Sequence, residues 1–137
     1  MDFDASERFL LANLADVLIP AGHGLPSASE AGVAHEGLDQ VLAVRPDLAD
    51  GLRKILAQAK DQDAPSFVAE LQTKAPASFG ILAELVPGAY FLNPRVRTAL
   101  GYDGQSARAI DTRPDYLEDG LIQSVIDRGP IFRPTPS

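Results

Sequence analysis

The spacing of apolar residues along this chain is helical almost throughout. Apolar side chains recur three and four positions apart, as they do on the buried face of an amphipathic helix. The strict alternation of apolar and polar positions that is typical of strands is missing, and no repeat of fixed period is visible. We therefore expect an all-α fold, a compact bundle of about five to seven short helices with an extended C-terminal tail.

The first helix is expected from about Ser6 to Leu18. Its predicted stripe consists of Phe9, Leu10, Asn13, Leu14, Val17 and Leu18. Pro20 ends this helix because its ring biases Ile19 away from helical geometry. Gly22 and Gly24 then permit a tight turn that redirects the chain.

The second helix is expected to begin at Ser27. The spacing Ser27-x-x-Glu30 is that of a capping box, in which each side chain accepts a hydrogen bond from the backbone N–H of the other residue. The predicted stripe consists of Ala31, Ala34, Leu38, Val41 and Leu42. Small residues in the first turns predict the close approach of another helix or of a partner.

Three more helices are expected before residue 90. Their predicted stripes are Leu48, Leu52, Ile55, Leu56 and Ala59; Phe67, Val68 and Leu71; and Phe79, Ile81, Leu82, Leu85 and Val86. Asp63 is the expected cap of the middle one, which ends near Pro76. We expect Pro87 and Gly88 to disturb the end of the last one.

The C-terminal third combines one short helix, a polar loop and a last helix. Asn93 is the expected cap of a helix that begins at Pro94 and stops at Gly101. The last helix is predicted from the apolar residues Leu117, Leu121, Ile122, Val125 and Ile126. We expect one helical domain over residues 1–137, in which 129–137 form an extended proline-rich tail.

Charge and hydropathy exclude several classes of partner. The net charge of −7 on 137 residues opposes binding to nucleic acid or to anionic lipid. No apolar run approaches the roughly 18 to 20 residues needed to cross a bilayer. We expect neither a nucleic-acid partner nor a membrane span.

The N-terminal residues and the lack of cysteine add two expectations. The segment "MDFDASERFLLANLADVLIP" begins acidic and does not resemble a secretory or twin-arginine signal. We expect a cytoplasmic location, with a periplasmic one as the alternative if a leader was removed or a partner carries the address. The absence of cysteine excludes disulfides, thiolate metal sites and a cysteine nucleophile.

The residues that could carry chemistry form no recognised catalytic pattern. The required side-chain types occur in two sets: His23, His35, Glu30 and Glu36 for a metal, and Ser27, Ser29, His23 and Asp39 for a nucleophilic triad. His35 and Glu36 are adjacent and point apart, and no strand-turn-helix elbow surrounds the serines. The glycines do not form a phosphate-binding loop. We assign no catalytic, cofactor-binding or metal-binding residue.

Aromatic and arginine residues form a more informative group in the last third of the chain. The predicted partner interface consists of Tyr90, Phe91, Arg95, Tyr102, Arg128, Phe132 and Arg133, with Arg97 nearby. Such residues are enriched at the centres of protein interfaces. The alternative is that Tyr90 and Phe91 close the core while the arginines are solvated.

The order of several segments resembles a known family. These segments are "LADVLIPA", "SASEAGVAHEGLDQVL", "YFLNPRVRTALGYDG" and "LIQSVIDRGPIFRP". Together they resemble the gluconate 2-dehydrogenase subunit 3 family, the small subunits that accompany FAD-dependent GMC-type dehydrogenases. The likeness runs from about Phe9 to Arg133, and its most specific parts are Ile19-Pro20, Ala28 to Val33 and Leu100-Gly101-Tyr102.

The resemblance implies a role beside a larger enzyme. The chain would be a non-catalytic accessory subunit that binds and stabilises a flavin-dependent alcohol or sugar oxidoreductase. FAD would then lie on that large partner, and a cytochrome or other electron acceptor would be reached through it. Many family members carry a twin-arginine signal that is missing here, which puts a role in export in doubt.

Two other functions stay open at this point. One is a stand-alone helical module that binds a small apolar molecule between its helices. The other is a small enzyme that uses His23, His35 or paired carboxylates, so whether the chain is itself an enzyme is left open.

Overall fold

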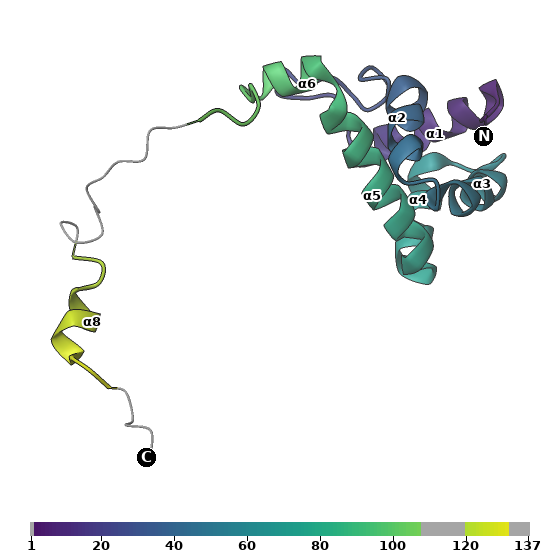
Figure 1. Cartoon of the computed structure of the whole chain (residues 1–137). Coiled ribbons are helices and arrows are strands. Elements are labelled where there is room, and N and C mark those ends of the chain that lie inside the picture. Colours follow the sequence, from purple (N-terminus) through teal and green to yellow (C-terminus); the bar gives the residue numbers. More distant parts are fainter. Residues whose placement is uncertain (1, 108–119, 132–137) are drawn as a thin grey trace. The chain divides into compact units, whose positions relative to one another are not determined.

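A computed structural model of the chain describes residues 2–107 and 120–131 (Figure 1). The chain forms two units, Met1–Gly104 and Gln105–Ser137. The regular elements of the described residues are helices, which confirms the all-α prediction. The extent of a single domain over residues 1–137 stays a prediction.

The first helix, α1 (Ala5–Leu18), begins with a capping box between Asp4 and Glu7. Its buried residues are Leu11, Leu14 and Ala15, while Phe9 is 67% exposed. The predicted stripe was therefore wrong at Phe9 and at the exposed Asn13. The small side chain of Ala15 gives little apolar signal in the sequence, yet it lies on the face that packs most closely.

The segment after α1 forms a turn where a helix was expected. The Ser27 N–H donates to Glu30 at 2.8 Å, and the Glu30 N–H donates to the Ser27 hydroxyl oxygen at 3.3 Å. Gly32 then adopts a left-handed conformation with φ of 73°, which no continuous α-helix accommodates. Regular backbone begins only with the π-helical turn η1 (Val33–Gly37) and continues as α2 (Leu38–Val44). The predicted start at Ser27 was wrong, because a capping box is a local arrangement that a single turn also satisfies.

The predicted stripe of this second segment is confirmed. Ala31, Ala34, Leu38 and Val41 are buried, and Leu42 is partly buried against the same core. The small residues also act as expected, since α5 approaches this segment closely.

The next two helices follow the prediction closely. All of the predicted stripe residues of α3 (Leu48–Ala59) and α4 (Ala64–Lys74) are buried. Asp63 caps α4 by accepting hydrogen bonds from the backbone N–H and the hydroxyl of Ser66, at 3.2 Å and 2.7 Å. These two donors hold the pKa of the Asp63 carboxyl below its usual value.

Helix α5 (Pro76–Leu92) passes through Pro87 and Gly88, which contradicts the predicted disturbance there. A proline inside a helix costs roughly 3 kcal/mol, partly because the carbonyl four residues earlier loses its donor. That residue, Ala83, is exposed, so water can replace the missing hydrogen bond. Beyond the proline, Ala89 and Tyr90 are buried, and their packing keeps the helix intact.

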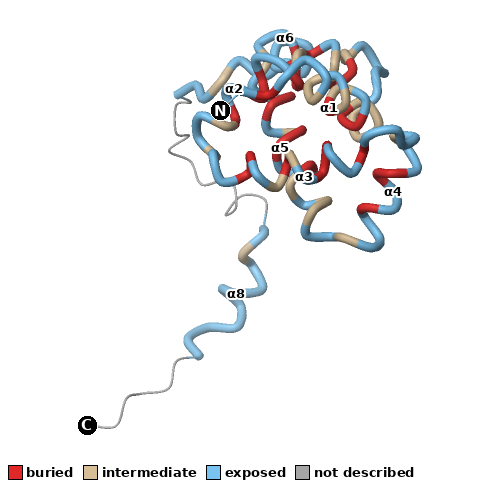
Figure 2. The backbone as a smooth tube through the Cα atoms, turned by 90° about the vertical axis from the view of Figure 1, so that its right-hand side faces the viewer, coloured by how far each residue is buried: buried red, intermediate tan, exposed pale blue. Residues whose placement is uncertain are grey.

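Helix α5 is the centre of the first unit. It contacts α1, η1, α2, α3, α4 and the short helix α6 (Pro94–Ala99). In Figure 1 it extends along α2, α3 and α4, and Figure 2 shows buried residues along the facing sides of these helices. The core of the unit therefore surrounds α5.

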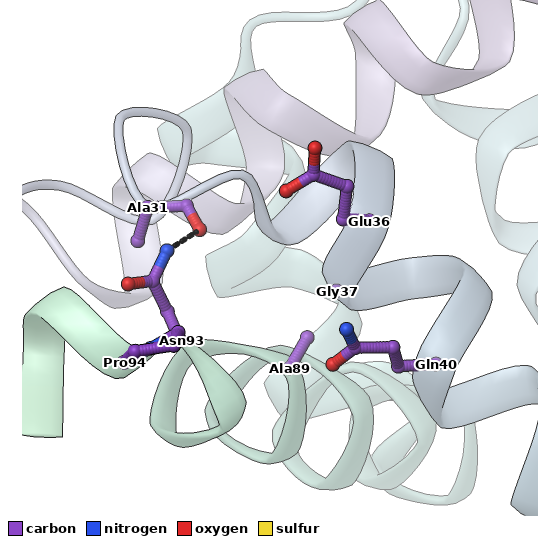
Figure 3. Close-up of a pocket in the computed structure, with 7 residues that line it drawn as sticks. All are labelled: Ala31, Glu36, Gly37, Gln40, Ala89, Asn93 and Pro94. Atoms are coloured by element: carbon purple, nitrogen blue, oxygen red, sulfur yellow. Dashed lines mark hydrogen bonds between the residues drawn. The ribbon is translucent and has the colours of Figure 1, made fainter.

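The backbone of η1 approaches α5 closely at Gly37. A Cβ atom added to Gly37 would lie 2.9 Å from the Cβ atom of Ala89, which is closer than two carbon atoms can pack. Figure 3 shows the two residues beside each other. Glycine at position 37 is therefore required for η1 to lie against α5 at this distance.

Arg8 supports the irregular backbone of η1 from the side of α1. His35 has φ of −117° and ψ of −108°, which breaks the helical geometry inside η1. The Arg8 guanidinium donates hydrogen bonds to the carbonyl oxygens of Ala34 and His35, at 3.0 Å and 3.2 Å, and to Asp39 at 2.7 Å. It thus supplies donors to carbonyls at the break and joins α1 to η1 and α2.

The second unit contains α8 (Gln123–Arg128) among its described residues. Leu121, Val125 and Ile126 are exposed there, whereas the predicted Leu117 and most of the predicted tail lie outside the described residues. No described helix combines the length and the apolar character needed to cross a lipid bilayer.

The Gly37 contact predicts a steric effect that opposes helix propensity. Gly37→Ala should lower the free energy of unfolding by about 1 to 3 kcal/mol, because the new methyl group overpacks the contact with Ala89. Gly80→Ala is the matched control, since Gly80 lies in α5 with open space around it and should gain up to about 1 kcal/mol. Urea denaturation measures both. Equal gains in stability would contradict the steric account.

The contacts of Arg8 predict that replacing it lowers the free energy of unfolding by more than the loss of its ion pair with Asp39 does. Arg8→Met keeps the apolar stem but removes the donors to the carbonyl oxygens of Phe3, Ala34 and His35, which should cost about 2 kcal/mol. Asp39→Asn removes only the exposed ion pair and should cost less than about 1 kcal/mol. Thermal unfolding measures both variants. Equal losses of stability would show that the hydrogen bonds to the carbonyl oxygens do not stabilise the fold.

Candidate interaction surface

His23 lies at the tip of a tight turn. The backbone groups of Gly22 and Leu25 exchange two hydrogen bonds, at 3.1 Å and 2.9 Å. His23 and Gly24 between them have φ of 52° and 80°, as the two central residues of a type I′ turn require. The His23 residue is exposed. The turn is therefore a structural joint, and its geometry explains the positive φ of both His23 and Gly24.

The residues after this turn are tied to α1 and α5. The Asp16 carboxylate on α1 accepts hydrogen bonds from the backbone N–H and the hydroxyl of Ser29, at 2.7 Å and 2.6 Å. The Tyr90 hydroxyl on α5 donates to the Pro26 carbonyl oxygen at 2.7 Å. The two helices on either side thus hold this segment by side-chain hydrogen bonds.

Several residues that were considered as metal ligands or as members of a catalytic triad form hydrogen bonds with other residues of the fold. Ser27 bonds with Glu30 and Ser29, and Asp39 bonds with Arg8. Among the residues that the structure describes, no group of three or more His, Asp and Glu side chains could hold a metal ion. His23 and His35 lie in different elements and are both exposed.

A small cavity lies between the η1–α2 segment and the C-terminal end of α5 (Figure 3). Its volume is about 40 Å³, and its lining residues are Ala31, Glu36, Gly37, Gln40, Ala89, Asn93 and Pro94. Pockets for small molecules usually measure roughly 300 to 1,000 Å³. This cavity therefore has room for water but not for the apolar ligand of a stand-alone binding module.

Asn93 lies beside this cavity and organises the junction between α5 and α6. Its side-chain amide donates to the Ala31 carbonyl oxygen at 2.8 Å, as Figure 3 shows. Its carbonyl oxygen accepts from the backbone N–H of Arg95 at 2.8 Å and of Val96 at 3.4 Å. The predicted cap is confirmed, and the same side chain also ties α6 to the turn before η1.

Tyr90, which was predicted at the interface, belongs to the core. The residue is 3% exposed and its hydroxyl is bonded to Pro26. Burial, and then the charge of Glu30, raise the pKa of the Tyr90 hydroxyl. A residue held in this way presents no free surface, so we leave it out of the proposed interface.

The remaining predicted residues of the first unit are exposed. Phe91, Arg95 and Tyr102 lie at the end of α5, in α6 and in the turn that follows α6. Arg128 is exposed in the second unit, and Phe132 and Arg133 lie outside the described residues. The structure therefore places three predicted residues within one short stretch of a single unit.

Two leucines belong to the same stretch and were missed by the sequence reasoning. Leu92 and Leu100, together with Phe91 and Tyr102, are between 44% and 52% exposed. The sequence held no signal for them, since a leucine is more often buried than exposed. We call the set Phe91, Leu92, Arg95, Arg97, Leu100 and Tyr102 the α5–α6 patch.

The backbone around the α5–α6 patch is well defined by hydrogen bonds. The Tyr102 N–H donates to the Arg97 carbonyl oxygen at 2.9 Å, and the Gly101 N–H donates to that of Thr98 at 3.0 Å. With φ of 70° at Gly101, this arrangement is a Schellman motif, and it confirms the predicted stop. Val96, which is fully buried, anchors α6 to the core.

An apolar groove lies between α2 and α5, with Leu92 on its edge. Val41, Val44, Leu48 and Gly88 line it, and its volume is about 310 Å³. Arg45 forms ion pairs with Asp47 and Glu84 beside the groove. The hydrogen bond from Arg45 lowers the pKa of the Asp47 carboxyl.

The turn geometry predicts how substitutions of His23 act. His23→Asn should raise the free energy of unfolding by up to about 1 kcal/mol, because Asn-Gly is the preferred centre of a type I′ turn. His23→Val should lower it by about 1 to 2 kcal/mol, because a β-branched residue is strained at positive φ. Urea midpoints test this order. If the Asn variant folded normally but abolished the activity of a partner enzyme, the structural interpretation of His23 would be wrong.

Comparisons of the chain with protein-family models, with curated proteins and with solved structures found no match.

Proposed function

We propose that this chain is a non-catalytic accessory subunit that binds and stabilises a flavin-dependent oxidoreductase of the GMC type. The observation that carries a binding role is the α5–α6 patch. The class of the partner rests on the resemblance of the chain to the gluconate 2-dehydrogenase subunit 3 family. That partner would oxidise an alcohol or a sugar hydroxyl.

The exposure of the α5–α6 patch supports a binding role. Its four large apolar and aromatic residues are about half exposed, although the unit has a continuous core around α5. Full burial of such a side chain contributes roughly 1.5 to 3 kcal/mol, so covering the exposed half would contribute on the order of 1 kcal/mol each. A partner that covers all four gains enough to offset part of the cost of association.

We place FAD on the partner because the resemblance to the gluconate 2-dehydrogenase subunit 3 family implies it there. In the proposed complex this chain supplies surface, and the flavoprotein supplies the cofactor and the catalytic base.

Co-expression tests this proposal. The GMC-type flavoprotein encoded nearest to this chain should be produced with and without it, and the two should co-purify. At a concentration of 100 times the Kd, the bound chain should stabilise the flavoprotein by about 2.7 kcal/mol. We therefore expect a higher thermal midpoint, more soluble protein and a larger flavin-to-protein absorbance ratio.

The same experiment has clear contrary outcomes. Equal solubility, flavin content and activity with no co-purification would reject the accessory role. Turnover of an alcohol or sugar by the purified chain alone would favour the alternative of a small enzyme. Loss of that turnover in His23→Ala or His35→Ala would then identify the residue involved.

A further inference from the structure

The α5–α6 patch carries a charge opposite to that of the chain as a whole. The chain has 19 acidic and 12 basic side chains, with a net charge of −7. Between Leu85 and Tyr102, however, the charged residues are Arg95 and Arg97, without a single aspartate or glutamate. The exposed apolar residues therefore share their stretch of chain with positive charge.

These two arginines have no ion-pair partner among the described residues. The ion pairs found there involve Arg8, Arg45, Arg53 and Lys74 instead. Arg95 and Arg97 are exposed, and α6 begins and ends with backbone geometry set by Asn93 and Gly101. The charges thus stand on a rigid short helix between two apolar ends of the patch.

We propose that the α5–α6 patch docks onto an acidic surface of a folded protein, with carboxylates around an apolar depression. Arg95 and Arg97 lie two positions apart on α6 and contact carboxylates on the two sides of the depression, which Phe91, Leu100 and Tyr102 enter. This inference rests on the proposed function and gives the surface that the flavoprotein must offer.

The composition of the patch favours a protein over a lipid or nucleic-acid surface. Membrane-surface sites for anionic lipids typically use clusters of four to eight basic residues, and the patch has two. The net negative charge of the chain would also repel a uniformly anionic polymer or bilayer. Tyrosine, phenylalanine and arginine on a preorganised backbone are typical of the centre of a protein interface.

The arginines of the patch should affect the association rate constant, and its apolar residues should affect the dissociation rate constant. Charges at the rim of an interface steer encounter and make association dependent on salt. Apolar anchors that are desolvated in the complex mainly slow dissociation. The proposed docking mode therefore predicts separate kinetic effects from the arginines and from Tyr102.

A charge variant with a matched control tests the arginines. Arg95→Glu places an acid in the first turn of α6 and Arg97→Gln removes a cation from its last turn, so the first change suits the helix dipole. Lys54→Glu with Lys60→Gln makes the same change in net charge at exposed residues of α3 and its end. Both double variants should retain wild-type circular dichroism.

Binding to the purified flavoprotein is then measured by surface plasmon resonance in 50 mM and 300 mM salt. We expect the arginine double variant to associate at least tenfold more slowly than wild type at low salt and to lose most of its salt dependence. The lysine double variant should remain within about threefold of wild type.

A second pair of variants tests the apolar part. Tyr102→Ala should raise the dissociation rate about tenfold or more, in line with the loss of an interface anchor. Phe9→Ala, at an aromatic residue of α1 that is 67% exposed and outside the patch, should change it less than twofold. Neither residue is buried in the core, so both variants should fold.

The outcomes separate this inference from the proposed function. If wild type binds the flavoprotein and both patch variants bind it more weakly, the docking surface and the accessory role are both supported. Wild-type binding that the patch variants retain overturns the docking surface alone. If wild type does not bind the flavoprotein, the docking surface and the accessory role are both overturned. Wild-type binding to phosphatidylserine vesicles or to single-stranded DNA, lost in the arginine variant, would overturn the choice of a protein as the partner.

Discussion

The close approach of η1 to α5 at Gly37 and Ala89 is the constraint on which the rest of the first unit depends. A side chain at position 37 would separate the two segments, since even a methyl group leaves 2.9 Å between carbon atoms. Beyond this contact, Tyr90 reaches Pro26 and Asn93 reaches Ala31. Three neighbouring points on α5 and its cap thus hold the irregular segment 26–37. Because Ala89 and Tyr90 face inward, Phe91 and Leu92 are turned toward solvent.

The helix ends that were predicted correctly depend on local hydrogen bonds. Asp63 and Asn93 cap helices with their own side chains, and Gly101 ends α6 through its positive φ, so short stretches contain all the information needed. The errors arose where distant packing decides between local alternatives. Helix α5 passes through Pro87 because Ala89 and Tyr90 beyond it are buried against η1 and the turn before η1. Ser27 forms its capping box but starts no helix, since the left-handed Gly32 intervenes.

The candidate surface could be predicted only in part from the sequence, because tertiary packing also decides which of its residues are exposed. Helix α5 is apolar nearly all round, so spacing cannot tell which residues near its end face the core. Phe91 and Tyr90 were equal candidates, and a tertiary hydrogen bond to Pro26 separates them. Arg95 and Tyr102 could be predicted, because arginine and a residue after a helix stop are normally exposed. Leu92 and Leu100 could not, because an isolated leucine is more often part of a core.

The α5–α6 patch is largely independent of the forces that fold the unit. Val96 alone ties α6 to the core by burial, and Asn93 fixes its direction by hydrogen bonds, while the exposed patch residues lie outside the continuous core. Changes in the patch can therefore alter the affinity for a partner without unfolding the protein. The rigid junction also means that little conformational freedom is lost on binding, which favours affinity at a modest contact area. In the proposed role of accessory subunit, this separation lets the binding surface change while the fold of the unit is retained.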